Sequence, residues 1–337
     1  MAGITRRGAG LATLGMLAAG VPLRRGAAQG AVQAWPTRPI RLIVPFPAGN
    51  AADITARLMS EEIAKRLGQP VVVDNRAGAS GAIGIQAVIA APADGHTLLV
   101  TSLSPLSIVP ALNRNLPYDG ERDLVPAALV GWTGMMLVAA PDFPANDLAG
   151  VVRELQTNPG RHSFANIGPG TLSHLTQEQF RLALGLNFEG VPYRGSGQAL
   201  MDVSAGRVGL MFDGMTSSLA QARAGRVKPI AVSSERRSAF APEVPTLAES
   251  GDPRLNAFQA VGWTGILAAR GTPDAAVARL NEAVNEALRE PALVQRFAAQ
   301  ALETYPPTSP AAFAAYIRAD LARWTRVVRE AGIRVEG

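Results

Sequence analysis

Two glycine-containing turns carry the clearest potential for binding chemistry in this sequence. In the first, Gly49 and Asn50 follow an apolar segment and precede a helical one, and residues 168–171 (GPGT) do the same in the second half of the chain. A helix N-terminus presents N–H groups without helical partners and the positive end of the helix dipole, so each turn can bind an anion. Each is also typical of an ordinary strand-to-helix connection, which needs glycine in any case. Two such turns facing one cleft favour the anion-binding interpretation.

The sequence contains no complete nucleotide-binding or hydrolase motif. Gly168 and Gly170 begin a dinucleotide-like pattern, but Ser173 stands where the third glycine belongs. There is no phosphate-binding G-x-x-x-x-G-K-[ST] motif and no G-x-S-x-G nucleophile elbow. Ser80 and Ser196 are candidate nucleophiles only because they lie beside glycines.

Titratable side chains near these turns have two or more interpretations. His174, in the first turn of a predicted helix, either caps or packs that helix or donates a hydrogen bond into the cleft, with a catalytic base as a third option. Asp53 either complements the start of a helix or touches a ligand, and Asp213 is open between the same two roles. For Arg76 we expect a structural ion pair with Asp74 or a neighbour.

Composition excludes several classes of site. The 337 residues contain no cysteine and three histidines, which excludes disulfides, thiolate metal sites and a cysteine nucleophile and leaves little room for a histidine-rich metal site. Hydrophobic residues make up 47% and charged residues 18%, which indicates folded domains, and the length suits two of them. We therefore expect no metal and no cofactor.

The basic charge is concentrated at the N-terminus. The formal net charge is +5, and residues 1–34 hold four arginines and no acidic residue, so the rest of the chain carries +1. This balance argues against a nucleic-acid partner. Residues 1–34 have the pattern of an export signal, with Arg6 and Arg7 before an uncharged segment and a small-x-small cleavage site at residues 32–34 or 26–28. The general secretory and twin-arginine routes both stay open.

The mature part alternates strand, turn and helix, which predicts parallel sheets with helices on their faces. Expected strands cover residues 40–46, 71–73, 97–101, 136–140, 188–193, 208–212 and 230–232. Expected helices cover residues 52–67, 83–91, 148–158, 171–184, 197–205, 274–289, 291–300 and 310–331. The uncharged window 124–141 contains proline and glycine, which favours strands and bends over a membrane helix.

A short internal repeat suggests how the chain divides. Residues 130–134 (VGWTG) recur as residues 261–265, each copy before an apolar strand. If these strands are crossovers between lobes, lobe 1 comprises residues 35–130 plus 262–337, and lobe 2 comprises residues 131–261. Two crossings make a hinge, with a cleft between the lobes.

Several strings in order then resemble one family. They are residues 35–49 (WPTRPIRLIVPFPAG), 74–84 (DNRAGASGAIG), 93–99 (ADGHTLL), 191–195 (VPYRG), 206–213 (GRVGLMFD) and 244–249 (VPTLAE). Their order and spacing are similar to the tripartite tricarboxylate transporter receptors, the Bug-type periplasmic solute-binding proteins. The resemblance covers essentially the whole mature chain.

The resemblance implies a fold, a ligand class and a site. The fold is α/β, of the type II periplasmic-binding-protein kind, with two doubly wound lobes joined by two crossover strands around a ligand cleft. The ligand is a small carboxylate held mostly by backbone amides and water. The residues implied to bind it are Phe46, Ala48, Gly49, Asn50, Ala51, Ala52, Asp53, Ala79, Ser80, Ser102, Asn166, Gly168, Gly170, Thr171, His174, Tyr193, Gly195, Ser196 and Asp213.

Three positions depart from the family pattern. Asn50 replaces a second glycine; we expect it to tolerate a positive φ while adding an amide to the turn. His96 replaces a common tyrosine, without consequence for a ligand. The segment 195–197 (GSG) lacks the usual proline before its helix, which puts the shape of this loop in question.

The sequence therefore predicts a monomeric periplasmic receptor, without catalytic residues, that captures a small carboxylate and delivers it to membrane permease subunits. One alternative is an exported hydrolase or isomerase of organic acids that uses Ser196 or His174. Another is a sensory receptor that reports to a membrane kinase.

Overall fold

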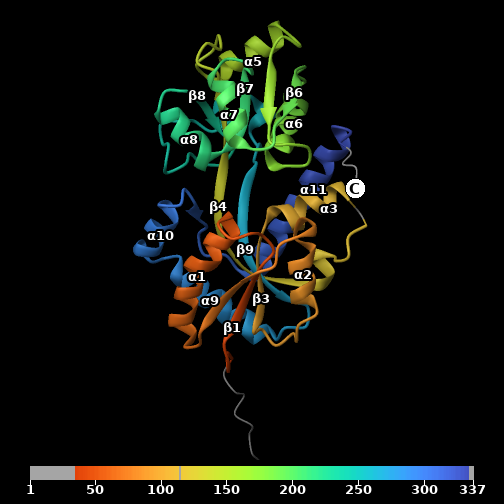
Figure 1. The fold of residues 1–337 in the computed structure, drawn as a ribbon, viewed down its shortest axis with the longest axis vertical. Coiled ribbons are helices and arrows are strands. Elements are labelled where there is room, and N and C mark those ends of the chain that lie inside the picture. Colours follow the sequence, from red (N-terminus) through yellow and green to blue (C-terminus); the bar gives the residue numbers. More distant parts are fainter. Residues whose placement is uncertain (1–34, 114, 334–337) are drawn as a thin grey trace, which may run out of the picture. The chain divides into compact units, whose positions relative to one another are not determined.

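The computed structural model describes residues 35–113 and 115–333, which belong to one compact unit (Figure 1). The predicted export signal, residues 1–34, lies outside the described residues. The strands are β1 (Ile40–Val44), β2 (Val71–Asn75), β3 (Thr97–Ser102), β4 (Leu124–Ala139), β5 (Ser163–Asn166), β6 (Glu189–Pro192), β7 (Leu210–Gly214), β8 (Lys228–Val232), β9 (Val261–Ala269) and β10 (Glu303–Thr304).

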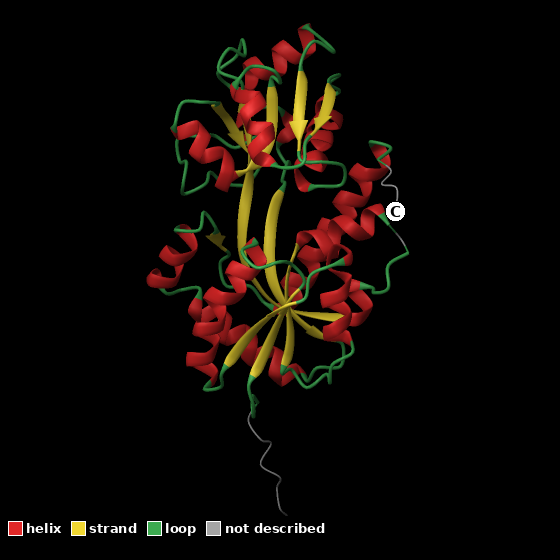
Figure 2. Cartoon of the chain, viewed as in Figure 1, coloured by secondary structure: helices red, strands yellow, loops and turns green. Residues whose placement is uncertain are grey.

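The α-helices alternate with these strands (Figure 2). They are α1 (Ala51–Leu67), α2 (Ala82–Ile89), α3 (Val109–Leu112), α4 (Gly120–Asp123), α5 (Leu148–Thr157), α6 (Leu172–Leu184), α7 (Ser196–Ser204), α8 (Met215–Arg223), α9 (Asp274–Ala287), α10 (Pro291–Ala298) and α11 (Pro310–Glu330). A π-helix, Ser104–Ile108, follows β3. No helix within the described residues is long and apolar enough to cross a membrane.

The strands are ordered β2-β1-β3-β9-β4-β7-β5-β6, and β8 and β10 also pair with β4. β1 is parallel to β2 and β3, and β5 is parallel to β6 and β7, whereas β4 and β9 are antiparallel to their neighbours. We refer to β1–β3 with their helices as lobe 1 and to β5–β8 with theirs as lobe 2. β4 serves both, because residues 124–134 pair with β9 and residues 135–139 pair with β7.

The internal repeat occupies the two long strands. Its copies lie side by side and antiparallel, with Trp132 opposite Trp263 and Gly134 opposite Val261. The expectation of two equivalent strands is confirmed, and both run between the lobes (Figure 1). The boundaries at residues 130/131 and 261/262 stay a prediction.

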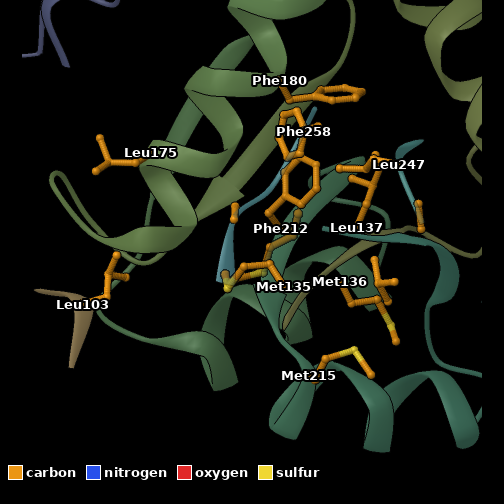
Figure 3. Packing of buried hydrophobic residues seen from close by; sticks show 14 of the residues in the cluster. Leu103, Met135, Met136, Leu137, Leu175, Phe180, Phe212, Met215, Leu247 and Phe258 are labelled. Carbon is orange, nitrogen blue, oxygen red and sulfur yellow. The ribbon is translucent and has the colours of Figure 1, made fainter. Parts of the chain in front are cut away.

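Apolar side chains fill both faces of the lobe 1 sheet and extend into lobe 2. On one face Met59 and Ile63 of α1 pack with Leu42 of β1, all fully buried. In lobe 2, the rings of Phe180 and Phe212 lie edge to face with centroids 5.5 Å apart (Figure 3). Burying one such side chain contributes about 1.5–3 kcal/mol to folding.

The lobe 2 core sets the position of the next residue along β7. Phe212 is fully buried and also stacks on Phe258, with centroids 6.4 Å apart. Asp213 follows it at the end of the strand. The apolar core thereby holds a carboxylate at the carboxyl end of β7, where lobe 2 presents the starts of its helices.

Candidate functional site

The loop between β1 and α1 is shaped by Gly49 and Asn50. Gly49 has φ +85°, a left-handed conformation that favours glycine. Asn50 is extended, with φ −73°, and its Oδ1 accepts the N–H of Ala52 at 2.7 Å. The turn does not use the tolerance of a positive φ that we expect of Asn50, because Gly49 supplies that conformation. Asn50 is instead the N-cap of α1, a role in which asparagine is among the best residues.

Asp53 holds this loop together. Its side chain is buried and accepts hydrogen bonds from the Gly49 N–H at 2.8 Å, Arg57 Nε at 3.0 Å and Asn75 Nδ2 at 2.9 Å. Burial raises the pKa of Asp53, but the bonds from Arg57, Gly49 and Asn75 together outweigh burial and leave the pKa below its ordinary value. Both carboxylate oxygens are thus engaged within the chain, which supports the structural interpretation of Asp53. A direct ligand contact stays a prediction.

Sequence reasoning missed two partners of Asp53. Arg57 lies four residues further along α1, so both side chains project from the same face of the helix, and this spacing was a usable signal. Asn75 ends β2, the parallel neighbour of β1, and its Nδ2 also donates to the Phe46 carbonyl at 3.1 Å. Arg76 pairs with Asp74 at 3.0 Å, as expected.

The turn before α2 is held in an uncommon backbone conformation. Residues 78–81 have φ angles of +129°, +45°, +52° and +96°, and the second and third of these belong to Ala79 and Ser80. Positive φ costs a non-glycine residue free energy, so packing must maintain the turn. The packing is close: a Cβ on Gly84 would lie 2.7 Å from the Pro45 Cβ. The turn is thereby fixed beside the start of the β1–α1 loop.

The remaining lobe 1 candidates cluster at the same edge of the sheet. Ser102 ends β3, which runs parallel to β1, so its position and the β1–α1 loop share the carboxyl edge of these strands. Ala51 and Ala52 form the first turn of α1, and Ala48 lies in the loop before it. The structure brings the predicted lobe 1 residues to one edge.

In lobe 2, the loop between β5 and α6 is closed by its own side chains. Buried Asn166 accepts the Gly168 N–H at 3.0 Å, and the Gly170 N–H donates to His174 Nδ1 at 3.1 Å. Thr171 donates to the Gly168 carbonyl at 2.7 Å and caps α6. The amides of Gly168 and Gly170 are thus donated within the loop, and the anion-binding interpretation of this turn stays a prediction.

His174 takes a defined tautomer from this arrangement. Because Nδ1 accepts the Gly170 N–H, the neutral ring carries its proton on Nε2 and can donate from there. Burial lowers the pKa of His174, and the opposing field of Glu178 does not restore it. The bond that His174 accepts from Gly170 holds the loop at the helix start, which fits the first of the roles weighed for it, and donation into the cleft stays a prediction.

The third group of candidates surrounds Asp213. Ser196 Oγ donates to Asp213 Oδ1 at 2.6 Å, and Ser217 donates to Oδ2. Burial raises the pKa of Asp213 despite these two hydroxyl donors. Ser217 was missed, although its position four residues after Asp213 was a usable signal. Gly195 is extended and α7 begins at Ser196, so the helix starts there without a proline.

Hydrogen bonds to backbone carbonyls connect the segments that carry the lobe 2 candidates. The Tyr193 N–H donates to the Asn166 carbonyl at 2.8 Å, and the Ser173 hydroxyl of α6 donates to the carbonyl of Phe212, the residue before Asp213, at 2.5 Å. Within residues 35–113 and 115–333, no hydrogen bond joins these candidates to those of lobe 1. The candidates thus form one group in each lobe. In the same described part of the chain, no set of three acidic or histidine side chains could hold a metal ion.

The clearest concave feature near the crossover strands lies elsewhere. A cavity of about 380 Å³ is lined by Trp132 of β4, Val261 of β9, Arg236 and Tyr305. None of the candidate residues lines it. That the candidate residues line a ligand cleft therefore stays a prediction.

Comparison with known proteins gives consistent matches over nearly the whole chain. Residues 55–333 match the family described as tripartite tricarboxylate transporter family receptor. Protein BugT of Bordetella pertussis is 38% identical over 303 residues, covering 90% of this chain and 92% of BugT.

Two solved structures with bound molecules are similar. Rpa4515 of R. palustris with adipate is 30% identical with a TM-score of 0.72, and the match covers 89% of this chain and 99% of that one. MatC from Rhodopseudomonas palustris with bound malate is 33% identical with a TM-score of 0.67, covering 87% and 100%.

Proposed function

Because the chain belongs to the tripartite tricarboxylate transporter receptor family, we propose that it captures a small carboxylate between its two lobes and presents it to membrane permease subunits. The observation that carries the proposal is the pair of relatives, each at least 30% identical over nearly its whole length, whose structures hold adipate and malate. Receptors of this family are periplasmic. We further propose that residues 1–34 direct export and are removed.

The chain is a receptor and not an enzyme, since the family and its relatives are receptors. The alternative with Ser196 or His174 as a catalytic group is therefore withdrawn. In the structure Ser196 donates its proton to a carboxylate, and His174 Nδ1 accepts a backbone N–H. Both side chains are positioned for hydrogen bonding.

The helix starts in the two lobes supply the donors for a carboxylate. Asn50 caps only one N–H of α1, that of Ala52, and within the described residues the N–H groups of Ala51 and Asp53 make no hydrogen bond. At the start of α6, the amides of Gly168 and Gly170 are bonded within the loop and do not reach a ligand. The donors there are instead the Nε2–H of His174 and the N–H groups of Leu172 and Ser173 in the first turn of the helix. N–H donors to a charged oxygen contribute about 1.5–3 kcal/mol each, so a few suffice for micromolar binding.

The first experiment is isothermal titration of residues 35–337 against mono- and dicarboxylates of two to eight carbons, with the matching methyl esters as controls. We expect at least one free acid to bind with micromolar or tighter affinity and its ester to bind far more weakly. If no acid binds and none stabilises the protein against heat, the proposal is wrong.

Asn50→Asp provides a sharp variant for the same experiment. Aspartate caps a helix as well as asparagine does, so folding is preserved, while a negative charge is added beside the proposed anion site. We expect the affinity for the carboxylate to fall at least tenfold. Asn187→Asp, at an exposed position, adds the same charge elsewhere and should leave affinity unchanged. Equal binding by both variants and the native protein would remove the start of α1 from the site.

Delivery to a membrane partner requires its own test. Vesicles that contain the membrane subunits of a tripartite tricarboxylate transporter from the same organism should accumulate the labelled acid only when the receptor is added. Binding without any uptake in such vesicles would favour a sensory role for the same receptor.

A further inference from the structure

Asp213 is a buried carboxylate in an unusual environment. It is 1% exposed and ends β7 between the N-terminal starts of α7 and α8. Among the described residues, no arginine, lysine or histidine nitrogen lies within 4 Å of it. Burial raises the pKa of Asp213, as expected for a carboxylate without a counter-ion. Its side-chain partners are the hydroxyl groups of Ser196 and Ser217, and the backbone of Gly214 also donates to it.

The direction of these two hydrogen bonds determines what the serines can still do. A hydroxyl group has one proton and two lone pairs. Because Ser196 and Ser217 both give their protons to Asp213, each oxygen has only lone pairs left for another molecule. The pair therefore offers hydrogen-bond acceptors, backed by a negative charge. A second carboxylate is disfavoured at this position, and an O–H or N–H donor is favoured.

The space in front of these serines is open. Ser196 and Ser217 are both half-buried, so part of each side chain reaches solvent. A Cβ added at Gly195, Gly197 or Gly214 would have no atom within 4 Å in the described structure. Gly195 and Gly197 flank Ser196, and Gly214 lies three residues before Ser217, so no side chain at these three positions restricts the space near the serines.

We propose that Ser196, Asp213 and Ser217 form a donor-binding subsite that selects carboxylates carrying a hydroxyl or ammonium group. The inference rests on the proposed function and deepens it, because it names the substituted acids as the ligand class. The ligand carboxylate then lies toward the starts of α1 and α6, where donors remain, and its hydroxyl or ammonium group lies toward Asp213. An ammonium group gains most, since it neutralises the buried charge.

The test compares matched acids that differ only in that substituent. The probes are succinate, malate and aspartate; glutarate, 2-hydroxyglutarate and glutamate; and adipate with its 2-hydroxy and 2-amino derivatives. In titration calorimetry we expect the hydroxy or amino member of at least one series to bind at least tenfold more tightly than the plain acid. The difference in affinity between the hydroxy acid and the amino acid of a series then shows whether the subsite prefers a hydroxyl or an ammonium donor.

Asp213→Asn tests the direction of the hydrogen bonds. An amide of the same shape donates to one serine, whose hydroxyl then turns its proton toward the ligand. We expect the preference for the hydroxy acid to disappear and the 2-oxo acid, which presents an acceptor, to bind more tightly than before. Glu243→Gln removes a charge at an exposed position and serves as the matched control. If Asp213→Asn does not fold, Ser217→Ala keeps the carboxylate and removes one acceptor, with the same expected loss of preference.

The outcomes separate this inference from the proposed function. If plain and substituted acids bind equally to the native protein, the subsite is refuted and the carboxylate receptor stands. If Asp213→Asn and Ser217→Ala both fold and keep the native preference, the selectivity has another origin and the assignment of these residues is overturned. If no carboxylate of any series binds, the proposed function fails, and this inference fails with it.

Discussion

Replacing Asp53 by asparagine should destabilise the protein more than any other isosteric change near the start of α1. The side chain is buried, and its carboxylate accepts bonds from the Gly49 N–H, Asn75 Nδ2 and Arg57. An asparagine at this position keeps the shape of the side chain, but its NH₂ group then faces one of the N–H groups that donate to Asp53. At least one of those donors then loses its acceptor inside the protein.

The magnitude follows from which partners are buried. Hydrogen bonds to a charged group contribute about 1.5–3 kcal/mol each, and the bonds from Gly49 and Asn75 are of this kind. Arg57 is 56% exposed, so its ion pair adds at most about 1 kcal/mol. Partial relaxation of the loop offsets some of the loss. We expect the free energy of unfolding to fall by about 3 kcal/mol, and Tm by about 6–12 °C.

Urea unfolding at pH 7, followed by circular dichroism, measures this difference. Arg57→Ala is the matched control, because it removes the exposed ion pair and leaves both buried bonds, and it should cost about 1 kcal/mol or less. Asp74→Asn, at a partly exposed carboxylate paired with Arg76, should cost still less. A loss below about 0.5 kcal/mol for Asp53→Asn would refute the argument that Asp53 organises the loop.

The pH dependence of the stability of Asp53→Asn tests whether the stabilisation comes from the ionised carboxylate. The pKa of Asp53 lies below its ordinary value of 3.8, so the folded state binds its proton less readily than the unfolded state. The stabilisation is therefore fully present above about pH 4 and is lost as the pH falls through the lowered pKa. The gap between native protein and Asp53→Asn should narrow below pH 4. A gap that stays constant down to pH 2 would contradict this origin.

Three further predictions concern single sites. Gly84→Ala should lower the free energy of unfolding by about 1–3 kcal/mol in urea titrations, because its Cβ would lie 2.7 Å from Pro45; a neutral result would mean that the strained turn before α2 moves freely. Trp263→Phe should cost about 1–3 kcal/mol or more, because it removes the 2.9 Å bond from the indole to buried Asp320, and an unchanged Tm would refute that bond. In ¹H–¹³C NMR the ring of His174 should titrate below pH 6.5, since burial lowers its pKa. The contribution of His174 to the free energy of unfolding is then lost as the pH falls below 6.5. A titration above pH 6.5 would contradict the assigned tautomer and burial.

Much of the fold was predictable because its local signals agree with one another. α1 ends at Gly68, which takes φ +70° as the helix C-cap, in accord with the expected stop. The three C-terminal helices begin at the expected residues and end within one or two residues of the predicted positions. Periodic apolar spacing bounded by glycine and proline was sufficient in these segments.

Several elements escaped the sequence reasoning, and two of them show the physical reasons. The strand predicted at residues 136–140 extends over Leu124–Ala139, because β-bulges near Pro126 and Gly131 accommodate residues that otherwise interrupt a strand. α8 was missed because its sequence, MTSSLAQAR, has few apolar positions and starts without a side-chain cap among its described residues. Pairing between distant strands and packing on β7 decide these elements, and neither is local.

The candidate site was predictable in position and less so in detail. The turns at Gly49 and residues 168–171 lie at helix starts, as the sequence indicated. Which N–H groups remain free depends on side chains that fold back onto the loop, such as Asn166 and His174. No spacing rule gives these bonds, because several short polar side chains could accept each amide.

These internal bonds also bear on how a ligand is held. A loop whose amides are already bonded to Asp53, Asn166 or His174 is ordered before the ligand arrives. The conformational entropy of the loop is then lost when the protein folds, so ordering the loop does not reduce the affinity for the ligand. With the loops already ordered, we expect any conformational change on binding to involve β4 and β9, the strands that run between the lobes. Binding kinetics should respond to substitutions at the glycines of these strands, such as Gly134, which lies opposite Val261, more than to substitutions that stiffen the loops.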